Sequence, residues 1–240
     1  MRAPDWSKTG PVQRPAPAIY ELTAIPEFGA FMLFAPWLAT APRGTGRRVL
    51  VLPGFTAGDV STAPLRLALR ALGHQPSPWG LGLNVGPDDE TVRQLLRLLE
   101  RLVKQNGGPI DIVGWSLGGI MARLLALHHP DRVRQVISLG SPIRIEDPQA
   151  NVSDAVRRLA QLSGLQRNRR GHDLTEVPVP STVIYSRQDG VVAAASCLQP
   201  VGPTAENIEV RGAHIGLGHN PSVIWAVADR LSLRVSRRPP

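Results

Sequence analysis

Residues 114–118, with the sequence GWSLG, constrain the fold of this chain more than any other stretch. They follow the apolar, β-branched run Ile110–Val113 and precede residues 120–127, whose apolar character suits a helix packed under a strand. A serine at the tip of so sharp a strand-to-helix turn has a strained backbone, so the positions two before and two after it must be nearly free of side chain. The two glycines of the pentapeptide meet this requirement. The pattern therefore predicts a buried strand, a nucleophile elbow with Ser116 at its tip, and a helix behind it.

From residue 47 onward, short β-branched runs alternate with helical patterns, as in a parallel sheet covered by helices. At 240 residues the chain is long enough for one large core and too short for two comfortable enzyme domains. We therefore expect the fold class α/β, with a predominantly parallel sheet flanked by helices, in a single domain over residues 19–240. Strands are expected at residues 47–52, 110–113, 133–139, 181–185 and 208–210, and helices at 62–72, 88–106, 120–129 and 221–231.

Two stretches depart from this alternation. Residues 1–18 contain four prolines among polar residues, so they are expected to form an arm that lies over the surface or is mobile. Residues 143–179 have no strand pattern, and only 152–162 have the pattern of a helix. We expect an insertion with one helix there.

The net charge of +8 raises the possibility of nucleic-acid binding, but the sequence argues against it. The basic residues are scattered along the chain, and no basic stripe interleaved with aromatic residues is present. The densest cluster falls within the insertion expected at 143–179 and is interpreted as a solvated face, with attraction of anionic substrates or an anionic lipid surface as the alternative. Its members are Arg157, Arg158, Arg167, Arg169 and Arg170.

The sequence contains only weak signals for a cellular compartment or for association with a membrane. Cys197 is the single cysteine, which excludes an internal disulfide, and no His/Cys cluster suggests a metal. Asp5 and several prolines interrupt the amino-terminal stretch where a secretory signal would need an apolar core, so a cytoplasmic location is the default. Residues 25–38 are the most apolar stretch but are too short and too interrupted to span a bilayer. We expect them to pack against the body, with membrane-surface contact as the less favoured interpretation.

A serine hydroxyl needs a base to take its proton and a carboxylate to orient that base. Asp189 follows the strand expected at 181–185 by a few residues, and Gly190 allows a tight turn there, so Asp189 is the candidate acid. A plain Asp-Gly turn is the structural alternative. His214, just after the last expected strand and among glycines, is the favoured base, and His219 is its competitor. The other histidines, at positions 74, 128, 129 and 172, are more simply surface or capping residues.

An oxyanion that develops during attack needs two backbone N–H donors. Leu117, directly after the serine, is expected to supply one, and Phe55, after the first expected strand, the other. A simple turn at Pro53–Phe55 is the alternative. The apolar side chains Phe55, Leu117, Trp115 and Trp79 predict a substrate pocket with hydrophobic walls.

On these residues the chain resembles the α/β-hydrolase superfamily over roughly residues 47–232, within its small lipase and esterase branch. Ser116, Asp189 and His214 match the triad of that family, and an Ala-His-Ile-Gly-Leu stretch surrounds the histidine. Pro53 stands where the family's His-Gly-x oxyanion loop has histidine, and Trp115 stands where a histidine often precedes the nucleophile. The resemblance implies hydrolysis of carboxylic esters through an acyl-enzyme, without a cofactor, and a lid or cap at residues 143–179.

Three functions remain open from the sequence. The leading one is a serine esterase or lipase-like hydrolase acting on a small-molecule ester or lipid, with short or medium acyl chains because the insertion is short. The second is acyl transfer, or hydrolysis of thioesters or amides, with the same triad. The third is a binding protein on a hydrolase scaffold that has lost its activity.

Overall fold

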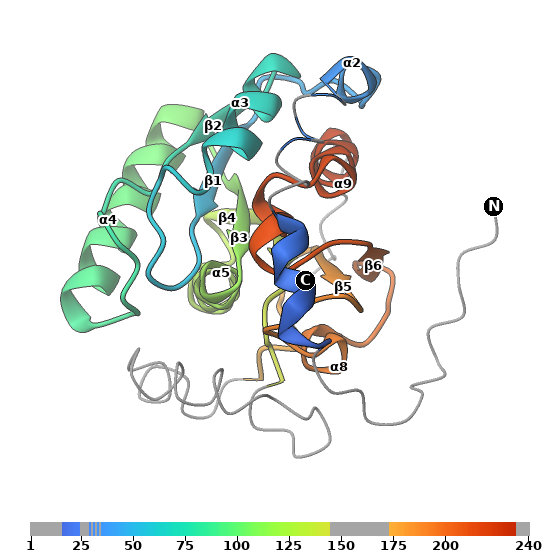
Figure 1. The fold of residues 1–240 in the computed structure, drawn as a ribbon. Helices are drawn as coiled ribbons and strands as arrows, with labels where there is room; N and C mark the ends of the chain where they lie inside the picture. The colour runs from blue at the N-terminus through green and yellow to red at the C-terminus, as the bar shows by residue number, and fades with distance from the viewer. Residues whose placement is uncertain are drawn as a thin grey trace.

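A six-stranded parallel sheet forms the centre of the protein, seen in a computed structural model that describes residues 16–24, 29, 31, 33, 35–144 and 173–233. Its strand order is β2-β1-β3-β4-β5-β6, and every neighbouring pair is parallel. Figure 1 shows the strands running through the middle of the molecule. They are β1 (Arg48–Leu52), β2 (Gln75–Ser77), β3 (Ile110–Trp115), β4 (Val133–Leu139), β5 (Ser181–Ser186) and β6 (Ala205–Val210).

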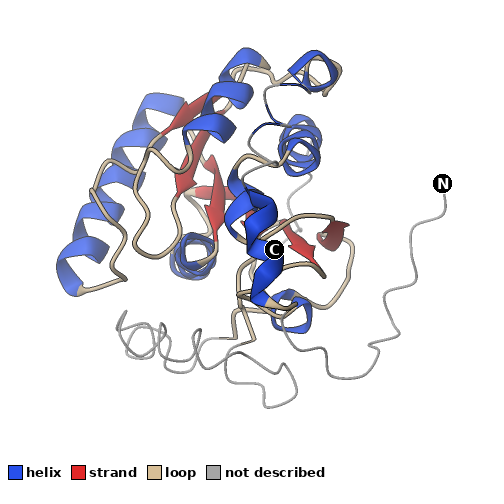
Figure 2. Cartoon of the chain, in the orientation of Figure 1, coloured by secondary structure: helices blue, strands red, loops and turns tan. Residues whose placement is uncertain are grey.

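Helices cover both faces of this sheet, as the colours of Figure 2 make plain. Helices α4 and α5 lie on one face, and α3 and α9 on the other (Figure 1). Parallel strands need such crossover connections, because no short turn can join them. The helices are η1 (Ala18–Thr23), α2 (Ala35–Leu38), α3 (Ala63–Ala71), α4 (Asp89–Asn106), α5 (Leu117–His128), α8 (Ala194–Cys197), η3 (Ile215–Gly218) and α9 (Pro221–Ser232).

The sheet divides the core into two layers. Successive side chains of a strand point to opposite faces of the sheet and therefore pack into different layers. Leu50 and Leu52 of β1 pack with α4 and α5, whereas Val49 and Val51 pack with α3 and α9. All four side chains are at most 1% exposed. The near-continuous apolar runs in the sequence thus reflect strands that are buried on both faces.

The strand order reverses between β1 and β3, and this reversal positions the site. From β1 the chain moves outward to the edge strand β2 and then returns past β1 to form β3. Loops that leave the carboxyl ends of β1 and β3 therefore diverge, and ligands of open α/β sheets bind in the crevice between such loops. The loop at Pro53–Phe55 follows β1, and Ser116 follows β3.

The expected fold class is confirmed, and every expected strand and helix outside the cap is present with its ends shifted by at most a few residues. The three-residue strand β2, which contains Pro76, was not expected from the sequence. Proline cannot donate a ladder hydrogen bond, but it is tolerated on an edge strand such as this one. Strand β6 begins at Ala205, three residues before its expected start, since this other edge strand carries polar residues on its exposed side.

The expected cap and arm lie mostly outside the described residues. Of the cap, the structure describes residues 143, 144 and 173–179, so the arginine cluster falls outside it. Of the arm, it describes residues 16–18. In the apolar stretch at 25–38, Trp37 stacks on Trp225 of α9, with ring centroids 6.3 Å apart, so this part packs against the body as expected. Within the described ranges, no helix combines the length and the apolar character needed to cross a membrane.

Candidate active site

Ser116 occupies the sharp turn between β3 and α5. Its φ of 53° and ψ of −118° are a strained combination for a residue with a side chain. The elbow packs directly on the end of β1: a Cβ added at Gly118 would lie 2.4 Å from the backbone oxygen of Leu52. Only glycine fits at that contact, so the glycine spacing read from the sequence has a steric cause.

The structure brings Ser116, His214 and Asp189 into one hydrogen-bonded chain. The Nε2 atom of His214 lies 3.1 Å from Oγ of Ser116, and its Nδ1 atom lies 2.6 Å from Oδ2 of Asp189. All three residues are buried. The second carboxylate oxygen, Oδ1, accepts hydrogen bonds from the backbone N–H groups of Val191 and Val192 at 2.9 and 2.6 Å. The carboxylate is thus fixed by its own loop on one side and by the imidazole on the other.

The competing histidines lie elsewhere. Nε2 of His219 lies 3.1 Å from the backbone oxygen of Ala24, and no contact with Ser116 is found among the described residues. His74 was expected at the surface or at a cap, but it is only 3% exposed, and its burial together with the nearby Arg47 lowers the pKa of its imidazole. His172 lies outside the described residues.

The loop after β1 lies against the serine. A Cβ added at Gly54 would stand 3.4 Å from Cβ of Ser116, which is ordinary van der Waals contact. The N–H of Leu117 is at the first position of α5, where a helix offers no acceptor. Within the part of the chain that the structure describes, neither this N–H nor that of Phe55 donates a hydrogen bond. Neither N–H group thus has an acceptor among the described residues, and their role as a pair of oxyanion donors stays a prediction.

Asn84 holds this loop in place and was not anticipated from the sequence. Its side-chain Nδ2 donates to the backbone oxygen of Pro53 at 2.7 Å, while its own backbone oxygen accepts from Thr56 N–H at 2.7 Å. The side chain is completely buried. A single asparagine in a loop of glycines has no sequence signature for such a role, because the contact spans 31 residues.

The two tryptophans expected to line the pocket have different surroundings. Trp115 is half-buried, and its indole N–H donates to the backbone oxygen of His214 at 3.2 Å, with the two rings 6.3 Å apart. Trp79 is 1% exposed and belongs to the core cluster that also contains Leu117, so its place in the wall of a substrate pocket stays a prediction. The carboxylate of Asp59 accepts from the N–H groups of Trp79 and Gly80 at 3.0 Å each, which fixes the orientation of this turn.

Gly140 is a further close contact of the hydrogen-bonded chain. It follows β4 with a φ of 53°, and a Cβ there would lie 3.2 Å from both Oδ2 of Asp189 and Nδ1 of His214. It would also lie 2.6 Å from the side chain of Leu217. The absence of a side chain at residue 140 therefore leaves room for the carboxylate and the imidazole to meet.

Other chemistry near the site is limited. Burial raises the pKa of the Cys197 thiol well above its usual value, which keeps it protonated and unreactive near neutral pH. In the described ranges no three His, Cys, Asp or Glu side chains gather into a metal-binding group.

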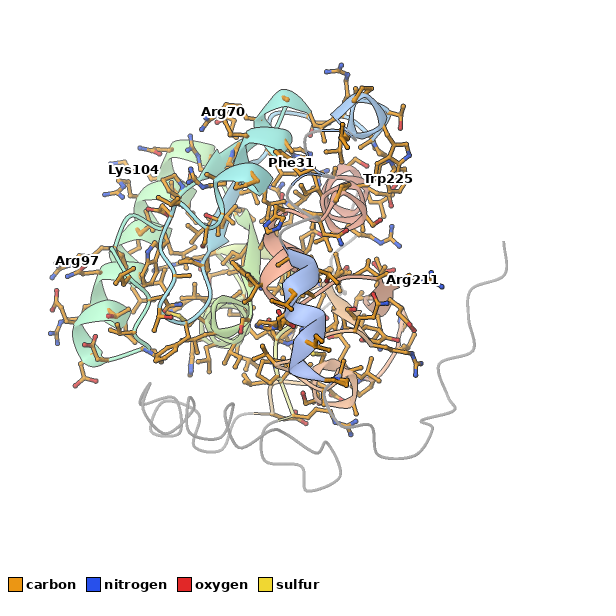
Figure 3. The ribbon with its side chains drawn as sticks, in the orientation of Figure 1. Phe31, Arg70, Arg97, Lys104, Arg211 and Trp225 are labelled. Atoms are coloured by element: carbon orange, nitrogen blue, oxygen red, sulfur yellow. The ribbon has the colours of Figure 1, made fainter. Side chains whose placement is uncertain are left out.

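Basic side chains come from several elements of the described part of the chain, and Arg48, Arg97 and Arg101 line one shared pocket. Figure 3 shows Arg70, Arg97, Lys104 and Arg211 pointing outward at the periphery. They come from α3, from α4 and from the loop after β6. The expectation that the protein does not bind nucleic acid stays a prediction.

Comparison with known families identifies the class of this protein. The family model described as alpha/beta hydrolase fold matches residues 49–177, which is more than half of the chain. The chain therefore belongs to the α/β-hydrolase fold family. Among solved structures, Aspergillus fumigatus lipase B is similar with a TM-score of 0.62 and 16% identity, covering 83% of this chain and 56% of that one. One of the metagenome-derived lipolytic enzymes LipS and LipT has a TM-score of 0.56 and 14% identity, covering 78% and 94%.

Curated relatives match shorter stretches. A pimeloyl-[acyl-carrier protein] methyl ester esterase of Neisseria meningitidis is 46% identical over 44 residues, 18% of this chain and 17% of the relative. Lipase LipV of Mycobacterium tuberculosis is 35% identical over 75 residues, covering 31% and 26%. A 2-hydroxymuconate semialdehyde hydrolase of Pseudomonas is 27% identical over 161 residues, covering 58% and 56%. The matches thus span between about a sixth and just over half of the length of these relatives.

Proposed function

We propose that this protein is a serine hydrolase that cleaves carboxylic esters through an acyl-enzyme. The observation that carries the proposal is the chain of contacts from Ser116 Oγ to His214 Nε2 at 3.1 Å and from His214 Nδ1 to Asp189 Oδ2 at 2.6 Å. A nucleophile within hydrogen-bond reach of a base, itself oriented by a carboxylate, is the arrangement that activates a serine hydroxyl.

Each residue then has a distinct task. His214 takes the proton of Ser116 as Oγ attacks the ester carbonyl, and returns it to the leaving alcohol when the tetrahedral intermediate collapses. Asp189 accepts the Nδ1 hydrogen, which leaves Nε2 as the proton acceptor and stabilises the imidazolium that forms. Water then attacks the acyl-enzyme with the same base, which releases the acid and restores Ser116.

The charge on the carbonyl oxygen is stabilised by the N–H groups of Phe55 and Leu117. Each such donor contributes roughly 100- to 1000-fold in rate, because it is already oriented toward the position where charge develops. The half-buried side chains of Phe55 and Trp115 give the site apolar walls. Esters with short or medium acyl chains are the proposed substrates.

The relatives support this reaction class. One similar curated protein is a methyl ester esterase, another is a lipase, and the similar solved structures include a lipase and lipolytic enzymes. They do not distinguish hydrolysis from transfer of the acyl group to another acceptor, for which the same triad serves.

A chain-length panel of p-nitrophenyl esters, from acetate to palmitate, tests the proposal on wild type and Ser116→Ala. The variant lacks the attacking oxygen, so kcat is expected to fall on the order of 10⁶-fold. Ser222→Ala is the matched control, because it removes a hydroxyl from an exposed position on α9 and leaves activity unchanged. Full activity in Ser116→Ala would refute the proposal, and a product ester formed from added alcohol at the expense of acid would replace hydrolysis by acyl transfer.

A further inference from the structure

A carboxylate from the amino-terminal segment reaches both loops of the candidate triad. Glu21 lies in η1, and its Oε1 atom accepts hydrogen bonds from the backbone N–H of Gly190 at 2.8 Å and of His214 at 2.9 Å. Its Oε2 atom accepts from the N–H of Ile215 at 2.9 Å. These contacts join residues 169 to 194 positions apart in the sequence.

The three N–H groups belong to the backbone that carries the base and the acid. His214 donates its own N–H, Ile215 follows it, and Gly190 directly follows Asp189. One oxygen, Oε1, thus joins the acid loop after β5 to the histidine loop after β6. The distance between these two loops sets the Asp189–His214 contact of 2.6 Å.

Two neighbouring contacts place the same segment against the same loops. The N–H of Ala16 donates to the backbone oxygen of Asp189 at 2.9 Å, and Nε2 of His219 lies 3.1 Å from the backbone oxygen of Ala24. Residues 16–24 therefore contact the loops that carry Asp189 and His214 at several points. In Figure 1 η1, in blue, crosses the front of the molecule close to the loops that follow β5 and β6.

We propose that Glu21 is a positioning residue for the Asp189–His214 pair, so that the amino-terminal segment completes the active site. Hydrogen bonds to a carboxylate are shorter and about twice as strong as neutral ones, and here three of them converge on one side chain. Misplacement of a catalytic group by about 1 Å can cost on the order of 100-fold in rate. The inference rests on the proposed function, since it assigns the base and the acid their roles in that reaction.

The alternative is that Glu21 merely anchors the segment. An anchor would affect the stability of the protein, or the affinity for substrate, without a specific effect on the chemical step. A positioning residue instead lowers kcat with little change in KM, because its contribution is realised in the transition state. It also alters the hydrogen bond between Nδ1 of His214 and Asp189, which is visible as a downfield proton resonance in NMR.

The experiment compares Glu21→Ala and Glu21→Gln with Glu100→Gln in the full-length protein. Glu100 pairs with Arg132 on the exposed face of α4, so its substitution removes the same charge far from the site, and an exposed ion pair contributes little to stability. Glu21→Gln keeps one oxygen for Gly190 and His214 but loses the acceptor for Ile215. For each protein we would measure kcat and KM with p-nitrophenyl butyrate, the rate of labelling by a fluorophosphonate, the melting temperature and the downfield resonance.

We expect kcat to fall about 100-fold in Glu21→Ala and about 10-fold in Glu21→Gln, with KM within twofold and a matching loss in labelling rate. The downfield resonance should shift or broaden in both variants and stay unchanged in Glu100→Gln. Values of kcat, labelling rate and resonance in Glu21→Gln equal to those of Glu100→Gln would overturn the inference, even if Glu21→Ala fails to fold. Ser116→Ala, assayed in parallel, separates the two proposals, because its retained activity would refute the proposed function whatever Glu21 does.

Discussion

Two buried carboxylates lie at opposite ends of the parallel strands and are held by different contacts. The side of the sheet where the strands end is called the carboxyl edge, and the side where they begin is called the amino edge. At the carboxyl edge, Asp189 accepts two backbone N–H groups and faces His214 at 2.6 Å. At the amino edge, Asp111 of β3 is completely buried, and its contacts are weaker: Gln135 at 3.2 Å and Arg134 at 3.4 Å. Burial therefore raises the pKa of Asp111 to about 6, against the opposing effect of Arg134.

The two edges differ in what their buried polar groups do. At the carboxyl edge, strained backbone and side chains held by loops keep polar groups in fixed positions, as at Ser116. At the amino edge, a polar group is buried with long contacts and costs stability whenever it is ionised. We expect substitutions at the carboxyl edge to change rates and those at the amino edge to change stability.

The largest contrast is between Asp189→Asn and Asp111→Asn. Asparagine at 189 can hydrogen-bond to the other imidazole tautomer, so kcat is expected to fall about 10⁴-fold at pH 7.5 with little loss of stability. Asp111→Asn should leave kcat within twofold. Ester hydrolysis and thermal unfolding of both variants check this prediction. An equal loss of activity in the two variants would contradict the claim that only the carboxyl edge controls the rate.

Next in size is Asn84→Ala, which releases the loop that carries the Phe55 N–H. We expect kcat to fall about 100-fold, the effect of losing one oxyanion donor, with a smaller change in KM. Asn106→Ala is the control, since that side chain bonds backbone oxygens of Gly108 and Pro109 at the amino edge. Steady-state kinetics with a soluble ester measure this difference. Equal kcat values for the two variants would contradict the prediction.

Gly140→Ala should lower kcat about 10-fold, because its Cβ would press on Asp189 and His214. The control is Gly107→Ala, which has a similar positive φ of 68° after α4 but nothing within 4 Å of the added atom. Both variants are expected to lose about 1 kcal/mol of stability from backbone strain alone. Any loss of kcat in Gly107→Ala equal to that in Gly140→Ala would show that strain, not crowding, is responsible.

The smallest effect on activity, and a clear one on stability, concerns Asp111. Its pKa is higher in the folded state than the usual value near 4, so its contribution is fully present below pH 4 and is lost as pH rises through 6. The free energy of unfolding of wild type should therefore fall by about 3 kcal/mol between pH 4 and 7 relative to Asp111→Asn. Urea denaturation of both proteins at several pH values measures this difference, and parallel curves would contradict it.

The sequence was sufficient for the features that depend on local spacing. The glycines around Ser116 and the strand-helix alternation are local patterns, and both are present in the structure. The placement of Asp189 and His214 after their strands also follows from chain order in a parallel sheet, because carboxyl ends meet at one edge.

Features that depend on distant contacts were not predictable. Asn84 and Glu21 act on backbone groups 31 to 194 positions away, and neither lies in a recognisable pattern. Trp79 was expected at the pocket because it is apolar, and the same property suits the core cluster in which it lies. Hydrophobic character alone cannot distinguish a pocket wall from a core residue.

The most direct test of the central claim, that Ser116 is the activated nucleophile, is intact-mass spectrometry after treatment with a fluorophosphonate, followed by peptide mapping. We predict one adduct per chain, located on Ser116, absent in Ser116→Ala and formed much more slowly in Asp189→Asn than in Asp111→Asn. No adduct on the wild-type protein, or an adduct formed at the same rate in Ser116→Ala, would contradict the account.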